Sequence, residues 1–283
     1  KENPGILIFL YNWLEGYEKL LLRAGFAINH FESLRDQLKK SMPYFENHLK
    51  SLLVEFLDRA QKLDAALYQP EPVFHAYKTN LPDDIALFLN QQIQFLSSQV
   101  TGETLLRFFS VWLTQLQTFV ANYSKGIIEF VRKETGLALM VIVINNLHKL
   151  TVHLNSTKKS ALKFFAMENL RESINNNFSL CISKMTSSIN EVLAHACALV
   201  YREINSKVFA RVFRPEWQAG NLLQVCTNTF LDFSDFIASK VENPTHYRVF
   251  CRMAMERLVS EYLQHFTWMV KNAFNADNVL PNF

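Results

Sequence analysis

Residues 243–274, which read NPTHYRVFCRMAMERLVSEYLQHFTWMVKNAF, place an apolar residue at every fourth position. This spacing is typical of an amphipathic helix that buries one face. Asn243 suits the cap of such a helix, and Pro244 suits its first position, where a missing N–H costs nothing. We therefore predict one long helix with a continuous buried stripe, formed by Phe250, Ala254, Leu258, Tyr262, Phe266, Val270 and Phe274, with Met255, Val259 and Leu263 widening it.

The opposite side of this helix is polar, and a second helix precedes it. Arg248, Arg252, Glu256, Ser260 and Gln264 recur at the same interval of four. The preceding helix is predicted to open at Asn221 and to bury Leu222, Cys226, Phe230, Phe233 and Ile237. Two such helices can bury their stripes only against more helices or a sheet, and nothing else in the chain is typical of a sheet.

Composition supports an all-helical fold. The 283 residues include only 7 Gly and 8 Pro, far fewer than turn-rich β architectures need. Hydrophobic residues reach 49% and charged residues only 19%, so much apolar surface must be buried between helices or against a partner. We predict an all-α fold, an elongated rod of consecutive antiparallel helical bundles.

The net charge and the cysteines indicate which class of partner and which cellular compartment to expect. A net charge of +3 is too small to imply nucleic acid. Four widely spaced cysteines in apolar helical patterns are expected to be core thiols in a reducing compartment. The longest aliphatic run, 137–144, is shorter than a bilayer span, and no signal peptide is evident, so we expect a soluble protein. The sequence starts without methionine, and we expect it to be a fragment.

Further helices follow from apolar periodicity and from proline positions. Residues 133–136 are the predicted boundary between a first bundle, 1–135, and a second, 136–283. Residues 173–177, Ser-Ile-Asn-Asn-Asn, are where we expect a break in the stretch 156–214, which has no Pro or Gly. No repeat of fixed length is present. The predicted helices are an opening segment with a seam of Ile6, Leu10, Trp13, Tyr17 and Leu20; 44–67, with Leu49, Leu52, Leu53, Phe56, Leu57 and Leu63 inward; 82–100; 101–132; and 137–154.

No catalytic signature is recognisable. A glycine-rich phosphate loop, a zinc-protease helix and a serine nucleophile elbow are absent from the sequence. Asp232 and Asp235 share a helix face, so an all-α enzyme of the isoprenoid-synthase type is an alternative. No second acidic cluster accompanies them, so solvated surface carboxylates are the favoured interpretation. We predict no enzyme activity, no metal and no cofactor.

Clustered basic residues are the candidate functional surface. Lys207, Arg211 and Arg214 share a face near a helix end, with Arg202 one turn earlier. Cations there offset the helix dipole, but they also suit an acidic protein or anionic lipid, to which each adds about 1 kcal/mol. Trp217, in a turn, is either a plug between bundles or an exposed anchor for a partner. The other candidate positions are Lys158, Lys159, Lys163, Arg248 and Arg252.

The chain resembles the Sec-six family of exocyst subunits, with its relative M-Sec. The resemblance covers most of the chain in order. It rests on Trp13 and Tyr17; on 141–146, Val-Ile-Val-Ile-Asn-Asn; on Trp217 followed by Gly220 and Asn221; on 230–236, Phe-Leu-Asp-Phe-Ser-Asp-Phe; and on the basic-to-apolar helix 247–266.

This resemblance implies a non-catalytic vesicle-tethering subunit made of helical bundles. It implies other exocyst subunits and SNARE proteins as partners, and cytoplasmic location with recruitment to the plasma membrane. An M-Sec-like role would link a Ral-type small GTPase to membrane protrusions and nanotubes. The polybasic lipid-binding segment of M-Sec has no counterpart in this chain, so binding to an anionic membrane is carried only by the basic residues named above. A direct membrane-shaping module is a further alternative.

Overall fold

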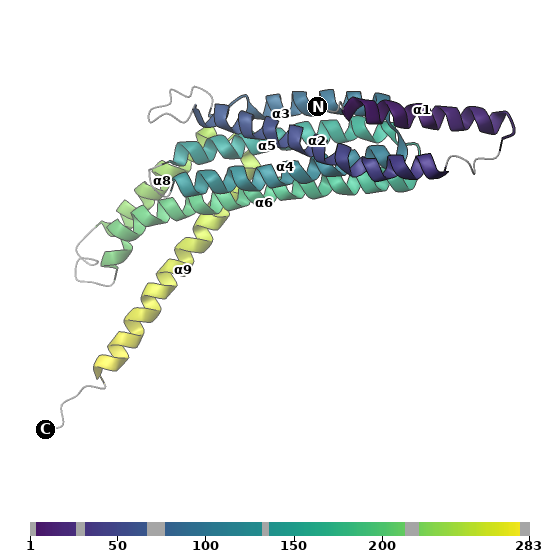
Figure 1. The fold of residues 1–283 in the computed structure, drawn as a ribbon. Coiled ribbons are helices and arrows are strands. Elements are labelled where there is room, and N and C mark those ends of the chain that lie inside the picture. The colour runs from purple at the N-terminus through teal and green to yellow at the C-terminus, as the bar shows by residue number, and fades with distance from the viewer. Residues whose placement is uncertain (1–3, 27–31, 67–76, 132–135, 213–220, 278–283) are drawn as a thin grey trace. The chain divides into compact units, whose positions relative to one another are not determined.

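The computed structural model describes residues 4–26, 32–66, 77–131, 136–212 and 221–277, and in these ranges the chain is helical with no strand. The predicted all-α class is confirmed (Figure 1). The helices are α1 (Pro4–Arg23), α2 (Glu32–Ala66), α3 (Leu81–Gln99), α4 (Gly102–Val131), α5 (Leu137–Ala161), η2 (Leu162–Phe164), α6 (Glu168–Lys207), η3 (Phe209–Arg211), α8 (Leu222–Lys240) and α9 (Pro244–Asp277), where η marks a short 3-10 helix.

Local start signals place several helix ends correctly. Helix α9 begins at Pro244, and the Asn243 side chain accepts a hydrogen bond from the Thr245 N–H at 2.9 Å. Helix α8 is preceded by Asn221, as predicted. Helix α3 has Pro82 in its first turn, with two aspartates on the positive end of the helix dipole. Caps and prolines therefore located these boundaries from sequence.

Helix α2 differs from the prediction at its start. It begins at Glu32 instead of Tyr44 and continues through Pro43. Met42 and Phe45, on either side of the proline, are both buried. Their packing maintains the helix although the proline removes one backbone hydrogen bond. Leu52 and Leu63, predicted to point inward, are exposed.

Helix α6 also differs, because it runs for 40 residues through the asparagine run where a break was predicted. The neighbouring Ile174 and Phe178 are fully buried. The Asn177 side chain donates a hydrogen bond to the Ser110 hydroxyl at 2.8 Å, so it does not compete with the helix backbone. The chain breaks earlier, between η2 and α6.

Two compact units make up the chain. The first contains Lys1–Pro72, Thr79–Tyr123 and Asn146–Thr186, and the second contains Val73–Lys78, Ser124–Asn145 and Ser187–Phe283. Helices α4, α5 and α6 therefore contribute residues to both. The predicted boundary between residues 135 and 136 lies within a segment of the second unit, and residues 133–135 are outside the described ranges. A division into two bundles at that point stays a prediction.

The first unit has an aromatic core. Helices α1, α2 and α3 contact one another. Phe109 of α4 lies between Phe165 and Phe178, with ring centroids 5.9 and 6.3 Å away. Trp112 and Phe108 of the same helix are almost fully buried. Such burial excludes water along the inner face of α4.

In the second unit, α9 contacts α8 and η3 and is hydrogen-bonded to α6. The Tyr201 hydroxyl donates a hydrogen bond to the Ala254 carbonyl at 2.6 Å. Phe250 and Ala254 are fully buried, as predicted for this part of α9. In α5, Met140, Val141 and Val143 are buried.

One described stretch, Leu137–Phe164, is long and apolar enough by composition to cross a membrane. The sequence prediction considered only the unbroken aliphatic run 137–144, and it missed this longer stretch because polar residues interrupt the stretch. Within its most apolar window, 56% is buried inside the structure. A core helix of a bundle has the same character.

Candidate docking surface

The paired asparagines of 141–146 are buried and hold backbone segments in place. In the second unit, the Asn145 amide donates hydrogen bonds to the carbonyls of Tyr77 (3.0 Å) and Lys240 (2.9 Å). Its oxygen accepts the Glu242 N–H at 2.9 Å. These three backbone groups are therefore shielded from water but keep a hydrogen-bond partner. Asn145 therefore fixes the start of the connection from α8 to α9.

Asn146 has the corresponding role inside the first unit. Its oxygen accepts the Thr79 N–H at 3.0 Å, and its amide donates to the Thr79 hydroxyl at 2.8 Å. It also donates to the Tyr123 hydroxyl at 3.0 Å, and that hydroxyl donates to Asp64 at 2.9 Å. The amide is fully used, so Asn146 is a structural residue.

A polar cluster that the sequence analysis did not identify lies between α3 and α5. The Lys149 ammonium is 2.5 Å from one Asp83 oxygen, and His153 Nε2 is 3.0 Å from the other. The hydrogen bond from Lys149 lowers the pKa of Asp83, desolvation opposes this, and His153 lowers it further. Asp83 also lies in the first turn of α3. Spacing along the chain does not reveal a pair 66 residues apart.

The apolar stripe of α9 is buried over only part of its predicted length. Phe250 and Ala254 are inside, whereas Tyr262 and Phe266 are each 43% exposed. The residues at the edge of the stripe, Met255, Val259 and Leu263, are also exposed. The prediction of one continuous buried face is therefore wrong for the C-terminal half of the helix. Periodicity identifies an apolar face but does not say how far its packing partners extend.

The seam predicted in α1 has the same outcome. Trp13 and Leu20 are 52% and 63% exposed, while Leu14 and Glu18 are buried. The Trp13 and Tyr17 rings stack at 5.2 Å. The apolar surface of α1 is therefore wider than the part that neighbouring helices cover.

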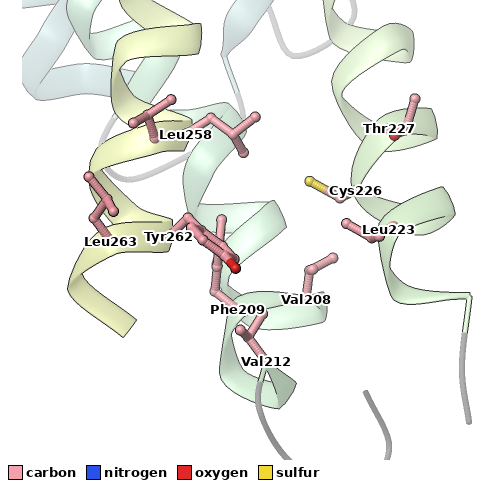
Figure 2. A pocket seen from close by; sticks show the side chains of 10 residues that line it. Val208, Phe209, Val212, Leu223, Cys226, Thr227, Leu258, Tyr262 and Leu263 are labelled. Atoms are coloured by element: carbon pink, nitrogen blue, oxygen red, sulfur yellow. The ribbon is translucent and has the colours of Figure 1, made fainter. Parts of the chain in front are cut away.

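A hollow opens in the second unit where η3, α8 and α9 meet (Figure 2). Its volume is about 370 Å³. Figure 2 shows the α8 side chains on one side, the α9 side chains on the other, and the η3 region between them. Its lining is formed by Val208, Phe209 and Val212, by Leu223, Cys226 and Thr227 of α8, and by Leu258, Val259, Tyr262 and Leu263 of α9.

A shallower depression continues from this hollow along α9. It has a volume of about 420 Å³ and shares Leu263 with the hollow. Trp268 and Lys271 also line it, together with Ser260, Gln264 and Thr267. We call the hollow and the depression together the α9 groove. Leu223, Leu263 and Trp268 are exposed by 67%, 52% and 69%, so its apolar lining is open to solvent.

The basic residues predicted near the end of α6 are close in sequence to residues that line this groove. Lys207 is the last residue of α6 and pairs with Glu203 at 3.2 Å. Arg211 ends η3 and is exposed, directly before the lining residue Val212. Arg202 is exposed on α6. Arg214 and Trp217 lie outside the described residues.

The remaining predicted basic positions lie on other elements. Lys158, Lys159 and Lys163 belong to the first unit, and Lys158 donates a hydrogen bond to the Ser179 hydroxyl at 3.2 Å. Arg248 and Arg252 are exposed on α9, and Arg252 faces Glu256 at 4.0 Å. Leu223 and Lys271, which line the groove, were missed because no sequence pattern distinguishes them from ordinary helix positions.

Asp232 and Asp235 are both exposed on α8. Among the described residues, no three His, Cys, Asp or Glu side chains converge on a point that could hold a metal ion.

The thiols of the described chain are free. Cys181 and Cys197 are buried, and desolvation raises the pKa of each to about 12. Cys226 and Cys251 are half-buried, and desolvation raises the pKa of Cys226, which lines the hollow. The expectation of core thiols thus applies to the first pair better than to the second.

Comparison with solved structures defines the class of the fold. The chain is similar to the structure described as "Crystal structure of the C-terminal domain of the exocyst subunit Sec6p", with a TM-score of 0.70 and 12% sequence identity. The match covers 82% of this chain and 65% of that one. At this identity the likeness concerns the fold. The chain is thus an all-α bundle protein of the kind found in that domain.

The family follows from the sequence itself. The family model of exocyst complex component Sec6 matches residues 10–277, nearly the whole chain. The chain belongs to the Sec6 family, which confirms the resemblance described above. No curated protein matches the sequence.

Proposed function

We propose that the chain is a non-catalytic scaffold subunit of an exocyst-type tethering complex, which binds the other subunits through its helix surfaces. The observation that carries this proposal is the match to the Sec6 family over residues 10–277. The geometry is consistent with it. The hollow of the α9 groove is lined mainly by aliphatic and aromatic side chains, and the depression adds Trp268, polar side chains and an exposed basic residue, Lys271. An exposed surface of this kind suits the binding of a partner protein.

The mechanism of such a subunit is geometric. Packed helices hold separate binding faces at fixed positions within each unit. Several weak contacts, once linked through one chain, raise the local concentration of each partner for the next contact. Asn145 and Asn146 support this role because they fix loop backbones to α5 within their own units.

We further propose partners and a location that follow from the family. SNARE proteins are proposed as additional partners, with recruitment from the cytoplasm to the plasma membrane during exocytosis. An M-Sec-like link between a Ral-type small GTPase and membrane nanotubes is the alternative branch. The exposed basic residues of unit 2 provide sites where acidic proteins could contact this chain.

Co-precipitation from cells tests the proposal. The tagged chain is expected to enrich other exocyst subunits over a tagged unrelated helical bundle. Detection of these subunits by quantitative mass spectrometry would support the proposed role. Recovery at the level of the unrelated bundle would contradict it.

Charge reversal tests the basic residues near the end of α6. Lys207, Arg211 and Arg214 are changed to glutamate together, with Lys158, Lys159 and Lys163 changed in a second variant. We expect the first variant to recover less of its partners. Unchanged recovery of exocyst and SNARE proteins, together with unchanged binding to anionic liposomes, would exclude this surface.

A further inference from the structure

We propose that the α9 groove is a docking site for an amphipathic helix of another protein, one whose apolar stripe is flanked by acidic residues. The inference deepens the proposed role as a binding subunit and rests on it, but it does not depend on which complex supplies the helix. It is carried by the shape, the exposed apolar lining and the charge of the groove.

The shape of the groove favours a helix as its partner over a flat lipid surface. The hollow of about 370 Å³ lies among η3, α8 and α9, so its apolar lining is recessed. A side chain projecting from a partner can enter such a hollow, whereas a lipid surface is best met by a protruding apolar face. The groove extends from Leu258 to Lys271, which corresponds to about 20 Å at the rise of an α-helix. That length matches three to four turns of a partner helix, roughly.

Part of the apolar lining of the groove is exposed to solvent. Leu223 and Leu263 are exposed by 67% and 52%, on opposite sides of the hollow. Trp268 continues the apolar surface with 69% exposure. An aromatic residue at the end of a recessed aliphatic surface is a typical anchor for a protein partner.

Charge identifies the partner's chemistry. The segments whose residues line the groove, 208–212, 223–227 and 258–271, contain two basic residues, Arg211 and Lys271, and one acidic residue, Glu261. Glu261 is paired with Arg257 at 3.1 Å. Arg211 and Lys271 are exposed and have no ion pair with a described carboxylate.

The unpaired charged side chains of these segments are therefore positive, as is the net charge of the whole chain, +3. An acidic flank on the docked helix would complement them.

The test uses defined peptides and the complete chain. A fluorescent 18-residue peptide carries leucines at i, i+3, i+4, i+7 and i+11 with glutamates flanking them. A second peptide has lysines in place of the glutamates, and a third is a scrambled version of the first. Fluorescence anisotropy gives the dissociation constants at low and at high salt. We expect the acidic peptide to bind about tenfold more tightly than the basic one, and the difference to shrink in salt.

Matched variants locate the site. Leu263→Glu should weaken binding of the acidic peptide about tenfold, because it places a carboxylate among apolar contacts and opposite an acidic flank. Leu87→Glu, at a leucine of α3 that is 60% exposed, should leave binding unchanged. Lys271→Glu should weaken binding, and Lys50→Glu on α2 should not. Circular dichroism checks that each variant keeps its helix content.

Four results would overturn the inference. These are equal binding of the acidic and basic peptides, equal binding of the scrambled peptide, no effect of Leu263→Glu, and no binding at all. Self-association of the chain that Leu263→Glu abolishes would assign the groove to a second copy instead. Binding to phosphatidylserine vesicles that Leu263→Glu abolishes, without peptide binding, would assign it to a membrane. Peptide binding without exocyst co-precipitation would refute the proposed complex but keep the groove.

Discussion

At the scale of residues, Asn145 is the side chain on which the geometry of the α8–α9 connection depends. It is 1% exposed and has three backbone partners, on Tyr77, Lys240 and Glu242. In the sequence, the Asn pair is part of a motif, which predicts no contact for either side chain. No local signal could have supplied one, because the partners lie 68 to 97 residues away.

Replacing Asn145 by alanine should lower the free energy of unfolding by about 3 kcal/mol, because buried carbonyl and N–H groups lose their partner. The matched control is Asn155→Ala on the same helix. Asn155 is exposed, and among the described residues its side chain bonds the Thr151 carbonyl alone, so its loss should cost less than about 0.5 kcal/mol. Urea unfolding followed by circular dichroism measures both. Equal costs would show that Asn145 does not hold the connection.

Asp83 should make stability depend on pH in acid. Its pKa is lowered in the folded state, mainly by the Lys149 hydrogen bond, so its contribution is complete above the unfolded value of 3.8 and is lost as the pH falls through the folded pKa. The side chain is 45% exposed, so the effect is small, about 0.5 kcal/mol.

The measurement compares Asp83→Asn with wild type at neutral pH and at pH about 3. We expect Asp83→Asn to be less stable at neutral pH and the difference to shrink in acid. Asp84→Asn is the control, since Asp84 lies in the same first turn of α3 and interacts with the same helix dipole. A difference that persists unchanged in acid would contradict the role of the Asp83 charge.

The thiols should react in an order set by burial. Cys181 and Cys197 have pKa values raised to about 12, so almost no thiolate forms near neutral pH. We expect iodoacetamide to modify the half-buried Cys251 and Cys226 first in the folded protein. Peptide mass spectrometry over a time course gives the order. Modification of Cys181 at the rate of Cys251 would mean that the core of the first unit opens readily.

At the scale of elements, α9 changes from a core helix to a surface helix along its length. Its capping residues and apolar period were both predictable from sequence, and both are present. The point where burial stops was not, because it depends on where the other elements of the second unit end. The same physical reason explains α1, whose Trp13 and Leu20 are exposed despite a regular seam.

Two aromatic residues of α9 test this change directly. Phe250 is fully buried, so Phe250→Ala should destabilise the protein by about 4 kcal/mol. Trp268 is 69% exposed, and Trp268→Ala should change stability by less than about 0.5 kcal/mol. The midpoints of urea unfolding of the two variants and of the wild type measure both changes in stability. A large loss for Trp268→Ala would mean that the groove is filled by the chain's own packing.

Helix continuity was the least predictable property of the elements. Pro43 and the asparagine run at 175–177 are helix-disfavouring residues, yet both lie inside helices. Buried neighbours, Phe45 in one case and Phe178 in the other, contribute more than the local propensity costs. Start signals were more reliable, because a cap or an early proline acts within one turn.

At the scale of the whole molecule, the all-α class and the Sec6 family were both predictable from sequence. Few Gly and Pro residues and a helical apolar period determined the class, and motifs in order along the chain indicated the family. The two units were not predictable, since α4, α5 and α6 each contribute to both and no linker marks a boundary. The groove was equally hidden, because residues 208–212, 223–227 and 258–263 come together only through packing.

The central claim is that this Sec6-family chain works as a binding subunit of an exocyst-type complex. Size-exclusion chromatography of extract from cells that express the tagged chain at native level tests it most directly. We predict that the chain elutes at high mass together with other exocyst subunits, and that depleting one of those subunits shifts it to lower mass. Elution at low mass, apart from every exocyst subunit and unaffected by their depletion, would contradict the claim.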